Sequence, residues 1–221
     1  MRQRADNDYL SLRQVAESEH AEIYRTLRFN LECLMAEQEL TTIAVASANQ
    51  AEGKTTTIVN LGRAFAKTGK RVLLLDANLR SPKLHRLLGS TDERNVRPGL
   101  VNILHGQCTI QEAIGLTELE GLHVLPAGQS ARDSFEMLSK SVVDRLLSGL
   151  KGSYDIILAD TCASLAYTEG RIIAACCDGV LLVVAQGKLK RAAAEKLNDQ
   201  LLQNKANILG IVLSQANPKE I

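Results

Sequence analysis

The sequence predicts an α/β fold in which a mostly parallel sheet is flanked by helices on both faces. Six apolar runs of strand length recur along the chain, separated by segments long enough for helices; they lie at 42–46, 72–75, 122–125, 156–159, 180–184 and 208–213. The runs are continuous rather than alternating, which indicates strands buried on both faces. Such strands, alternating with helices, are typical of a parallel sheet.

The length of 221 residues fits a single domain over residues 1–221. We expect an N-terminal arm and a helix over residues 1–40 and the α/β core over residues 41–221. The helix is predicted at 17–39, where an apolar stripe at helical spacing should pack on the core; it comprises Ile23, Leu27, Leu31 and Leu34. The polar segment 89–100, with Gly and Pro near its ends, is predicted to be a surface loop.

Composition excludes several classes of partner. The 26 basic and 25 acidic residues nearly balance, so no overall field draws the chain to nucleic acid or to an anionic membrane. The five cysteines form no C-x-x-C pair, which favours free thiols in a reducing cytoplasm. The longest apolar runs, such as 180–185, are too short to span a bilayer. We expect a cytoplasmic protein that reaches a membrane only through a partner.

Residues 48–55 fit the phosphate-loop pattern G-x-x-x-x-G-K-[ST], with Ala48 in place of the first glycine. A predicted strand leads into this loop and a predicted helix follows it. In that context the backbone N–H groups of the loop and the helix N-terminus form an anion site. The alternative is a chance E-G-K-T turn, which the strand, the helix and two later acidic strand ends disfavour.

The phosphate-loop interpretation assigns roles to individual side chains. Lys54 is expected to reach the β- and γ-phosphates, the Thr55 hydroxyl to ligate Mg²⁺, and Gly53 to let the backbone approach the phosphates. The predicted nucleotide-binding residues are Asn49, Gln50, Ala51, Glu52, Gly53, Lys54, Thr55 and Thr56. A guanine reader of the form N-K-x-D is missing, since the segment 204–207 reads NKAN, so ATP is the expected nucleotide.

Two further predicted strands end in aspartates, Asp76 and Asp160. An isolated Asp after a strand is usually a turn former or a helix cap. The carboxyl ends of parallel strands share one crevice, however, where both carboxylates can hold Mg²⁺ directly or through water. The sequence therefore predicts a metal site of Thr55, Asp76 and Asp160, and a catalytic set of Lys54, Asp76 and Asp160.

Several segments of the chain carry a family pattern. EIYRTLR has Glu22, Arg25 and Arg28 at the spacing E-x-x-R-x-x-R, LLLDANLRSP contains Asp76 and Arg80, and YDIILADT contains Asp160. Together with GLVNILHGQCTIQEAI and GLHVLPAGQ, these segments make the chain from about residue 19 to 217 resemble the bacterial tyrosine kinases of capsular and exopolysaccharide loci, within the deviant-Walker P-loop ATPases. In that resemblance they match, in order, the oligomerisation motif, which makes the helix within residues 1–40 an oligomerisation helix, the second Walker motif, the Walker B strand and the connecting segments.

The resemblance implies a P-loop NTPase fold and transfer of the ATP γ-phosphate to tyrosines in a neighbouring subunit's tail. It implies a homo-oligomeric ring whose contacts use Glu22, Arg25 and Arg28. It also implies docking on a membrane adaptor that controls polysaccharide chain length and export.

Several residues depart from the family pattern. Asn78 stands where the second Asp of a D-x-D is usual, Gln50 and Ala51 replace Pro-Gly, and Ser214 replaces an adenine-side Asn. The C-terminal SQANPKEI carries no tyrosine, which leaves Tyr9 as the expected acceptor. Three functions stay open: a tyrosine kinase with weak or lost activity, an ATPase switch, and a nucleotide-binding pseudokinase that is a structural partner of the export adaptor.

Overall fold

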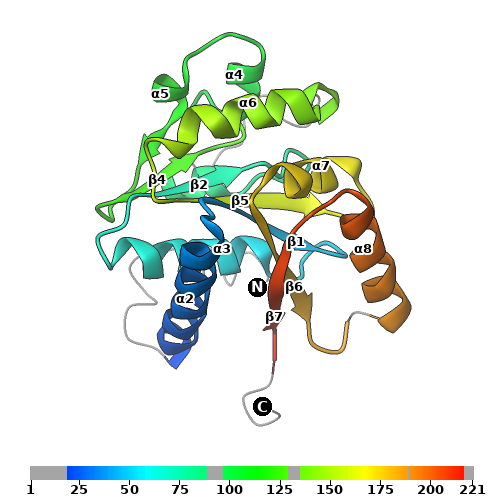
Figure 1. The fold of residues 1–221 in the computed structure, drawn as a ribbon. Helices are drawn as coiled ribbons and strands as arrows, with labels where there is room; N and C mark the ends of the chain where they lie inside the picture. Colours follow the sequence, from blue (N-terminus) through cyan, green and yellow to red (C-terminus); the bar gives the residue numbers. More distant parts are fainter. Residues whose placement is uncertain (1–18, 89–96, 129–134, 189, 217–221) are drawn as a thin grey trace, which may run out of the picture.

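The computed structural model describes residues 19–88, 97–128, 135–188 and 190–216 and shows a sheet between layers of helices (Figure 1). Its elements, in chain order, are α2 (Glu19–Gln38), β1 (Thr42–Ser47), α3 (Lys54–Ala66), β2 (Val72–Asp76), η1 (Leu84–Leu88), α4 (Leu100–Leu104), α5 (Ile110–Ala113), β3 (Gly115–Leu116), β4 (Leu122–Leu125), η4 (Phe135–Met137), α6 (Lys140–Lys151), β5 (Ile156–Ala163), α7 (Thr168–Cys176), β6 (Gly179–Ala185), α8 (Arg191–Gln203) and β7 (Ile208–Ser214).

In the described part of the chain the sheet has seven strands in the order β3-β4-β2-β5-β1-β6-β7. Every neighbouring pair is parallel except β3 and β4, which are antiparallel. The six predicted strands and the mostly parallel sheet are confirmed. Strand β3 was not predicted, because two residues are too few to give a periodic signal.

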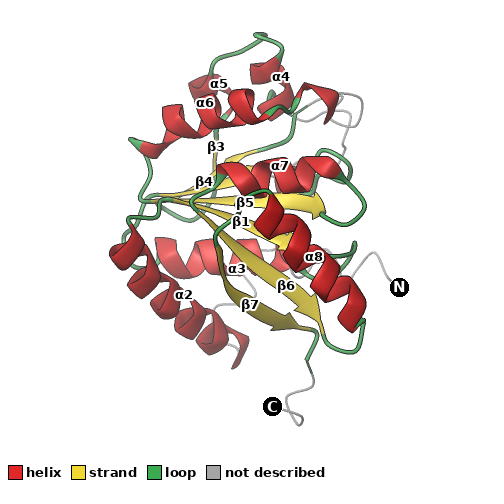
Figure 2. Cartoon of the chain, turned by 45° about the vertical axis from the view of Figure 1, so that its right-hand side comes forward, coloured by secondary structure: helices red, strands yellow, loops and turns green. Residues whose placement is uncertain are grey.

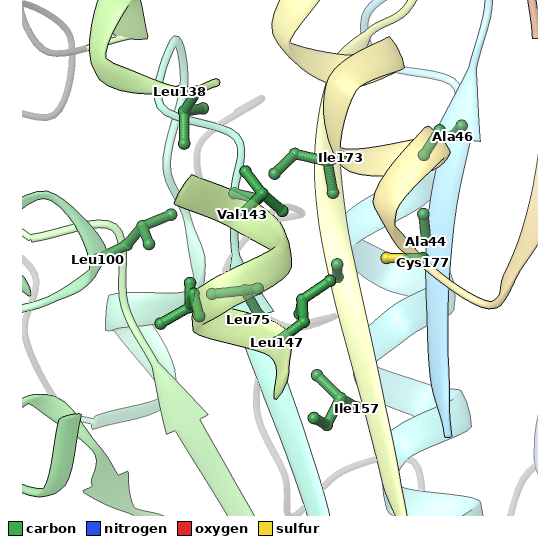
Figure 3. Packing of buried hydrophobic residues seen from close by; sticks show 14 of the residues in the cluster. Ala44, Ala46, Leu75, Leu100, Leu138, Val143, Leu147, Ile157, Ile173 and Cys177 are labelled. Carbon is green, nitrogen blue, oxygen red and sulfur yellow. The ribbon is translucent and has the colours of Figure 1, made fainter. Parts of the chain in front are cut away.

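Helices cover both faces of this sheet. Figures 1 and 2 show α2 and α3 on one face and α4 to α8 on the other. Successive strand residues point to opposite faces, so Leu74 packs in the core under α3 with Phe65, whereas Leu75 packs in the core under α6. Figure 3 shows Leu147 of α6 close to Leu75 and Ile157 in this second core. The prediction of helices on both faces is confirmed.

The predicted helix at 17–39 is observed as α2, but one of the four residues predicted to face the core does not do so. Leu31 is buried and Leu27 and Leu34 pack against the core beneath α3, but Ile23 is 61% exposed. Tyr24 packs on that core instead. It lies three residues before Leu27, so it continues the same stripe, and its phenol hydrogen-bonds with Thr57 and Asn60 of α3.

Some predictions fall outside the described residues. The predicted acceptor Tyr9 lies there, as do residues 89–96 of the predicted 89–100 loop. The last residue of that predicted loop, Leu100, is instead the first residue of α4. Across the ranges that the structure describes, every helix is too short or too polar to cross a lipid bilayer.

Candidate functional site

The strand order brings the predicted site residues to one edge of the sheet. Strand β5 lies between β2 and β1. Asp76 at the end of β2 is the register partner of Asp160 on β5, and Ser47 at the end of β1 pairs with Ala163 farther along β5. The loop that follows Ser47 therefore starts beside both aspartates, as the sequence predicted.

The loop between β1 and α3 contains two residues in the left-handed backbone region. Gly53, immediately before α3, has φ 97°, and a Cβ there would lie 3.3 Å from the Ser214 side chain. Ala51 has φ 58°, a conformation that disfavours residues with a Cβ. Ala51 is also where the resemblance expects glycine, so this departure places local strain in the loop.

Polar contacts inside the loop hold its shape. The Glu52 carboxylate is 1% exposed and accepts hydrogen bonds from the Asn49 backbone and side-chain amides, both at 3.0 Å. Ser214 Oγ donates to the Glu52 carbonyl oxygen at 2.5 Å, and Gln215 Nε2 donates to the Ala51 carbonyl oxygen at 3.0 Å. Sequence reasoning missed this clamp from the end of β7, because no local pattern connects segments so far apart.

Lys54 begins α3 and its ammonium lies inside the loop. Its Nζ donates to Ser47 Oγ at 2.6 Å and to the Asn49 carbonyl oxygen at 3.3 Å, and the residue is only 6% exposed. Burial lowers the Lys54 pKa, while the charges of Asp160 and Glu52 oppose that shift. Its two hydrogen-bond acceptors are neutral oxygens, so the ammonium can exchange them for phosphate oxygens.

Thr55 connects the loop to the aspartate edge. Its Oγ1 donates to Asp160 Oδ2 at 2.6 Å. Asp160 is fully buried, and its other oxygen, Oδ1, has no hydrogen-bond partner within the described residues. Burial raises the pKa of Asp160, and the Thr55 hydrogen bond and the Lys54 charge partly offset that effect.

Asp76 is held by backbone donors. Its Oδ2 accepts from the Lys83 and Leu84 N–H groups, both at 2.9 Å, and its Oδ1 accepts from the Asn78 N–H at 3.3 Å. Burial first, and the Asp160 charge second, raise the pKa of Asp76 to about 7. The carboxyl is therefore partly protonated at neutral pH, and a cation bound next to it would favour release of its proton to water.

Asn78 and Arg80 follow β2 and have different surroundings. The Asn78 side-chain oxygen accepts the Ser81 N–H at 3.3 Å, so the amide caps its own turn. Arg80 forms an ion pair with the buried Glu169 at 2.6 Å, and its guanidinium lies 4.7 Å from the centre of the Tyr167 ring. Gln50 Nε2 of the loop donates to the hydroxyl of the same tyrosine, Tyr167, at 3.5 Å.

The residues at this edge fit a magnesium ion. A cation at this edge would give the unpartnered Asp160 Oδ1 a ligand and would lower the raised pKa of Asp76. A hydroxyl and two carboxylates are the oxygen donors that Mg²⁺ prefers, and Mg²⁺ usually takes its other ligands from water and substrate phosphates. Among the residues that the structure describes, no group of three or more His, Cys, Asp or Glu could form an all-protein metal cage.

Comparison with known proteins agrees with this geometry. A family model described as an AAA domain matches residues 40–209. The chain is 32% identical to the tyrosine-protein kinase YwqD of Bacillus subtilis (strain 168) over 195 residues, 88% of this chain and 81% of that protein. The chain belongs to the bacterial tyrosine-kinase family of P-loop ATPases. It is also 29% identical to the succinoglycan biosynthesis transport protein ExoP of Rhizobium meliloti (strain 1021), covering 92% of this chain and 26% of ExoP.

Solved structures in this family and beyond it share the fold. The kinase domain of the Escherichia coli tyrosine kinase ETK matches with a TM-score of 0.83 and 26% identity, covering 95% of this chain and 82% of that domain. The septum site-determining protein MinD of Pyrococcus horikoshii OT3, complexed with Mg-ADP, matches with a TM-score of 0.68 and 26% identity, covering 81% and 75% of the two chains. The predicted P-loop fold and family resemblance are confirmed.

Proposed function

We propose that this bacterial tyrosine-kinase family member binds ATP with Mg²⁺ through the loop Asn49–Thr56, within a single domain. The observation that carries the proposal is the convergence of Lys54, Thr55, Asp76 and Asp160 at one buried edge of the sheet. The Mg-ADP complex of the MinD neighbour supports the same nucleotide and metal class.

Each of these side chains has a proposed role. Lys54 would exchange Ser47 and Asn49 for the β- and γ-phosphate oxygens, and the N–H groups of the first α3 turn would donate to the same phosphates. Thr55, Asp76 and Asp160 would hold Mg²⁺. When bound, the ion neutralises charge on the phosphate oxygens. Asp76 and Asp160 contribute by staying ionised next to it.

The proposed reaction is transfer of the γ-phosphoryl group to a tyrosine hydroxyl, with weak activity. In this transfer the bond from the γ-phosphorus to the bridging oxygen breaks and ADP leaves with the electron pair, while the tyrosine oxygen bonds to the phosphorus and its proton passes to solvent. The names of the curated relatives support tyrosine as the acceptor. Asn78 supports low activity, because its amide cannot act as a base and its oxygen is already used by the Ser81 N–H.

The proposal includes a homo-oligomer formed through α2. Glu22 and Arg25 form an exposed ion pair at 2.6 Å, and Arg28 pairs with Glu32 at 2.5 Å in a half-buried position. Ile23 and Phe29 are 61% and 62% exposed on the same helix. Large exposed apolar side chains beside charged ones are typical of a protein contact surface.

The proposed setting is the cytoplasm, with membrane association through an adaptor for exopolysaccharide export. ExoP, a transport protein of succinoglycan biosynthesis, contains a region similar to almost the whole chain. We propose that this chain meets an adaptor of that kind as a separate partner and regulates polysaccharide chain length and export.

A second candidate function lacks tyrosine-kinase activity: the chain is either an ATPase switch that assembles with ATP and disassembles after hydrolysis, or a nucleotide-binding pseudokinase that is a structural partner of the export adaptor. The observation that favours it is the Asn78 side chain, which forms a turn instead of adding a carboxylate to the metal edge.

Phosphotyrosine and ATP turnover, measured on the same samples of wild type and Lys54→Met, separate these functions. Transfer without a large excess of hydrolysis supports the kinase. Hydrolysis without phosphotyrosine supports the switch. Nucleotide binding with neither activity supports the pseudokinase, and no nucleotide binding contradicts the proposal as a whole.

A further inference from the structure

A second group of cations lies away from the nucleotide loop, in a pocket between α2 and α3. Tyr24 and Arg25 of α2 line it together with Asn60, Arg63 and Lys67 on the α3 side, and no described acidic residue does so. Arg63 follows Lys54 by nine residues on α3, a distance of about 14 Å along a helix. The pocket is therefore separate from the phosphate loop.

Arg63 has an unusual environment for an arginine. The residue is 6% exposed, and its Nη1 is buried without a hydrogen-bond partner in the described part of the chain. Burial lowers the pKa of its guanidinium, but an arginine stays charged at neutral pH. A buried charge without a partner carries a large desolvation penalty, so an anion at this point would relieve it.

The neighbouring side chains do not supply that anion. Lys67 lies one helical turn after Arg63 and adds a like charge. Arg25 is paired with Glu22, but both side chains are more than half exposed, at 60% and 69%, and such surface pairs are weak. The Tyr24 phenol hydrogen-bonds with Thr57 and Asn60. The pocket thus offers donors and positive charge and lacks a negative group.

We propose that this pocket binds one phosphate group. Its volume is about 40 Å³, far below the 300–1,000 Å³ of ordinary small-molecule pockets, so it accommodates a single group and excludes a nucleotide. Three cations around one small space favour a dianion over a carboxylate. The group is either free inorganic phosphate or a phosphoryl group on a protein side chain, and both present the same oxygens.

Calorimetric titration of inorganic phosphate into the full chain tests the proposal. The protein is first saturated with Mg²⁺ and a non-hydrolysable ATP analogue, so that the phosphate loop is filled. We expect one phosphate per chain, and at least a tenfold loss of affinity in Arg63→Met, because one charge-assisted contact is removed. Arg191→Met is the matched control, since the Arg191 side chain is 93% exposed on α8; it should bind phosphate like wild type.

Lys54→Met separates this proposal from the proposed nucleotide site. Its phosphate loop lacks the ammonium, yet phosphate affinity in the pocket should stay at the wild-type value. Arg63→Met should show the reverse pattern, with unchanged nucleotide affinity and lost phosphate binding. Phosphate binding that disappears in Lys54→Met and survives in Arg63→Met would overturn the pocket as a phosphate site.

Thermal unfolding distinguishes a binding role of Arg63 from a structural one. Without phosphate, Arg63→Met should unfold at the same temperature as wild type or higher, because it removes an unpaired buried charge. Phosphate at a hundredfold excess over its Kd should raise the wild-type Tm by about 5–10 °C, and should raise that of Arg63→Met far less. A Tm lowered equally by Arg63→Met with and without phosphate would show that Arg63 is only structural.

Competition experiments identify the source and class of the anion. Phenyl phosphate that binds more tightly than inorganic phosphate would indicate a phosphotyrosine side chain, whereas equal or weaker binding would indicate the free ion. Acetate should bind at least tenfold more weakly than phosphate. Acetate binding as tight as that of phosphate would contradict the proposal.

Discussion

Asp76 and Asp160 are register partners on the neighbouring strands β2 and β5, and both side chains are fully buried. Burial raises the pKa of both carboxyls, and the Asp160 charge adds to this effect at Asp76, whose pKa rises to about 7. Two buried carboxyls side by side are stable when they carry a proton or when a cation lies next to them. This pair therefore couples the stability of the empty protein to pH and to Mg²⁺.

The nucleotide-free protein should lose stability as pH rises from about 4 to about 7. The folded-state pKa of Asp76 is above the unfolded value of 3.8, so the folded state binds more protons in this window, and unfolding becomes easier as they leave. Asp76→Asn should reduce this pH-dependent loss in the free energy of unfolding by an amount on the order of a few kcal/mol. Denaturant unfolding at pH 5 and at pH 7.5 measures this, and an equal pH dependence in both proteins would contradict it.

Lys54→Met should weaken ATP binding by about 10–150-fold while the protein stays folded, because a charge-assisted contact contributes about 1.5–3 kcal/mol. Lys70→Met is the control, since Lys70 is an exposed lysine beyond the end of α3. Calorimetry with ATP and Mg²⁺ measures both affinities. Unchanged affinity in Lys54→Met would remove the phosphate-loop interpretation.

Ala51→Gly should stabilise the protein by about 1 kcal/mol, because glycine adopts a positive φ without a Cβ clash. The expected rise in Tm is about 2–4 °C for a chain of this size. Ala192→Gly, at an exposed position in α8, is the matched control and should lower stability by a similar amount. A lower Tm for Ala51→Gly would show that the left-handed backbone at Ala51 is not strained.

Replacement of Glu22, Arg25 and Arg28 by alanine should reduce the mass of the assembly that forms with ATP and Mg²⁺, as measured by light scattering. In the control, alanine replaces both members of two exposed ion pairs on other helices, the Lys140–Asp144 pair and the Arg191–Glu195 pair. An exposed pair contributes only about 0–1 kcal/mol to folding, so the control should keep its assembly. A wild-type protein that is monomeric at every concentration would contradict the α2 interface.

Much of the fold was predictable because its signals are local. Six continuous apolar runs became six strands, and the loop before Lys54 was recognised because a strand, a glycine and a helix follow one another in the sequence. The rule that parallel strands share one carboxyl edge then placed Asp76 and Asp160 next to the loop, and their register pairing agrees with it.

The errors and omissions arise from contacts between distant segments. Ile23 fits the helical stripe by spacing, but only the position of α3 decides that Tyr24 fills that place. The hydrogen bond from Ser214 to Glu52 joins residues 162 positions apart in the sequence, and the ion pair between Arg80 and Glu169 joins residues 89 positions apart. No periodicity or motif encodes such pairs, so sequence reasoning alone could not have found them.

The last prediction is that the chain is a poor tyrosine autokinase while it binds ATP with Mg²⁺. Phosphoryl transfer depends on positioned metal ions that neutralise the developing charge, and Asn78 gives the metal edge one carboxylate fewer than a D-x-D motif would. Of the tyrosines in the described residues, Tyr154 is 8% exposed and Tyr24 and Tyr167 are half-buried. We therefore expect little phosphotyrosine after incubation with ATP, with Tyr9 as the main site.

Asn78→Asp should raise ATP turnover, because it restores a carboxylate beside Asp76 while an Asp oxygen can still accept the Ser81 N–H. Asn78→Ser is the control, since it keeps a hydrogen-bonding side chain and adds no charge. ATP turnover and mass spectrometry on the purified chain measure both effects. Stoichiometric tyrosine phosphorylation of wild type that is lost in Lys54→Met would refute the prediction of weak activity, because the metal edge would then support efficient transfer with Asp76 and Asp160 alone.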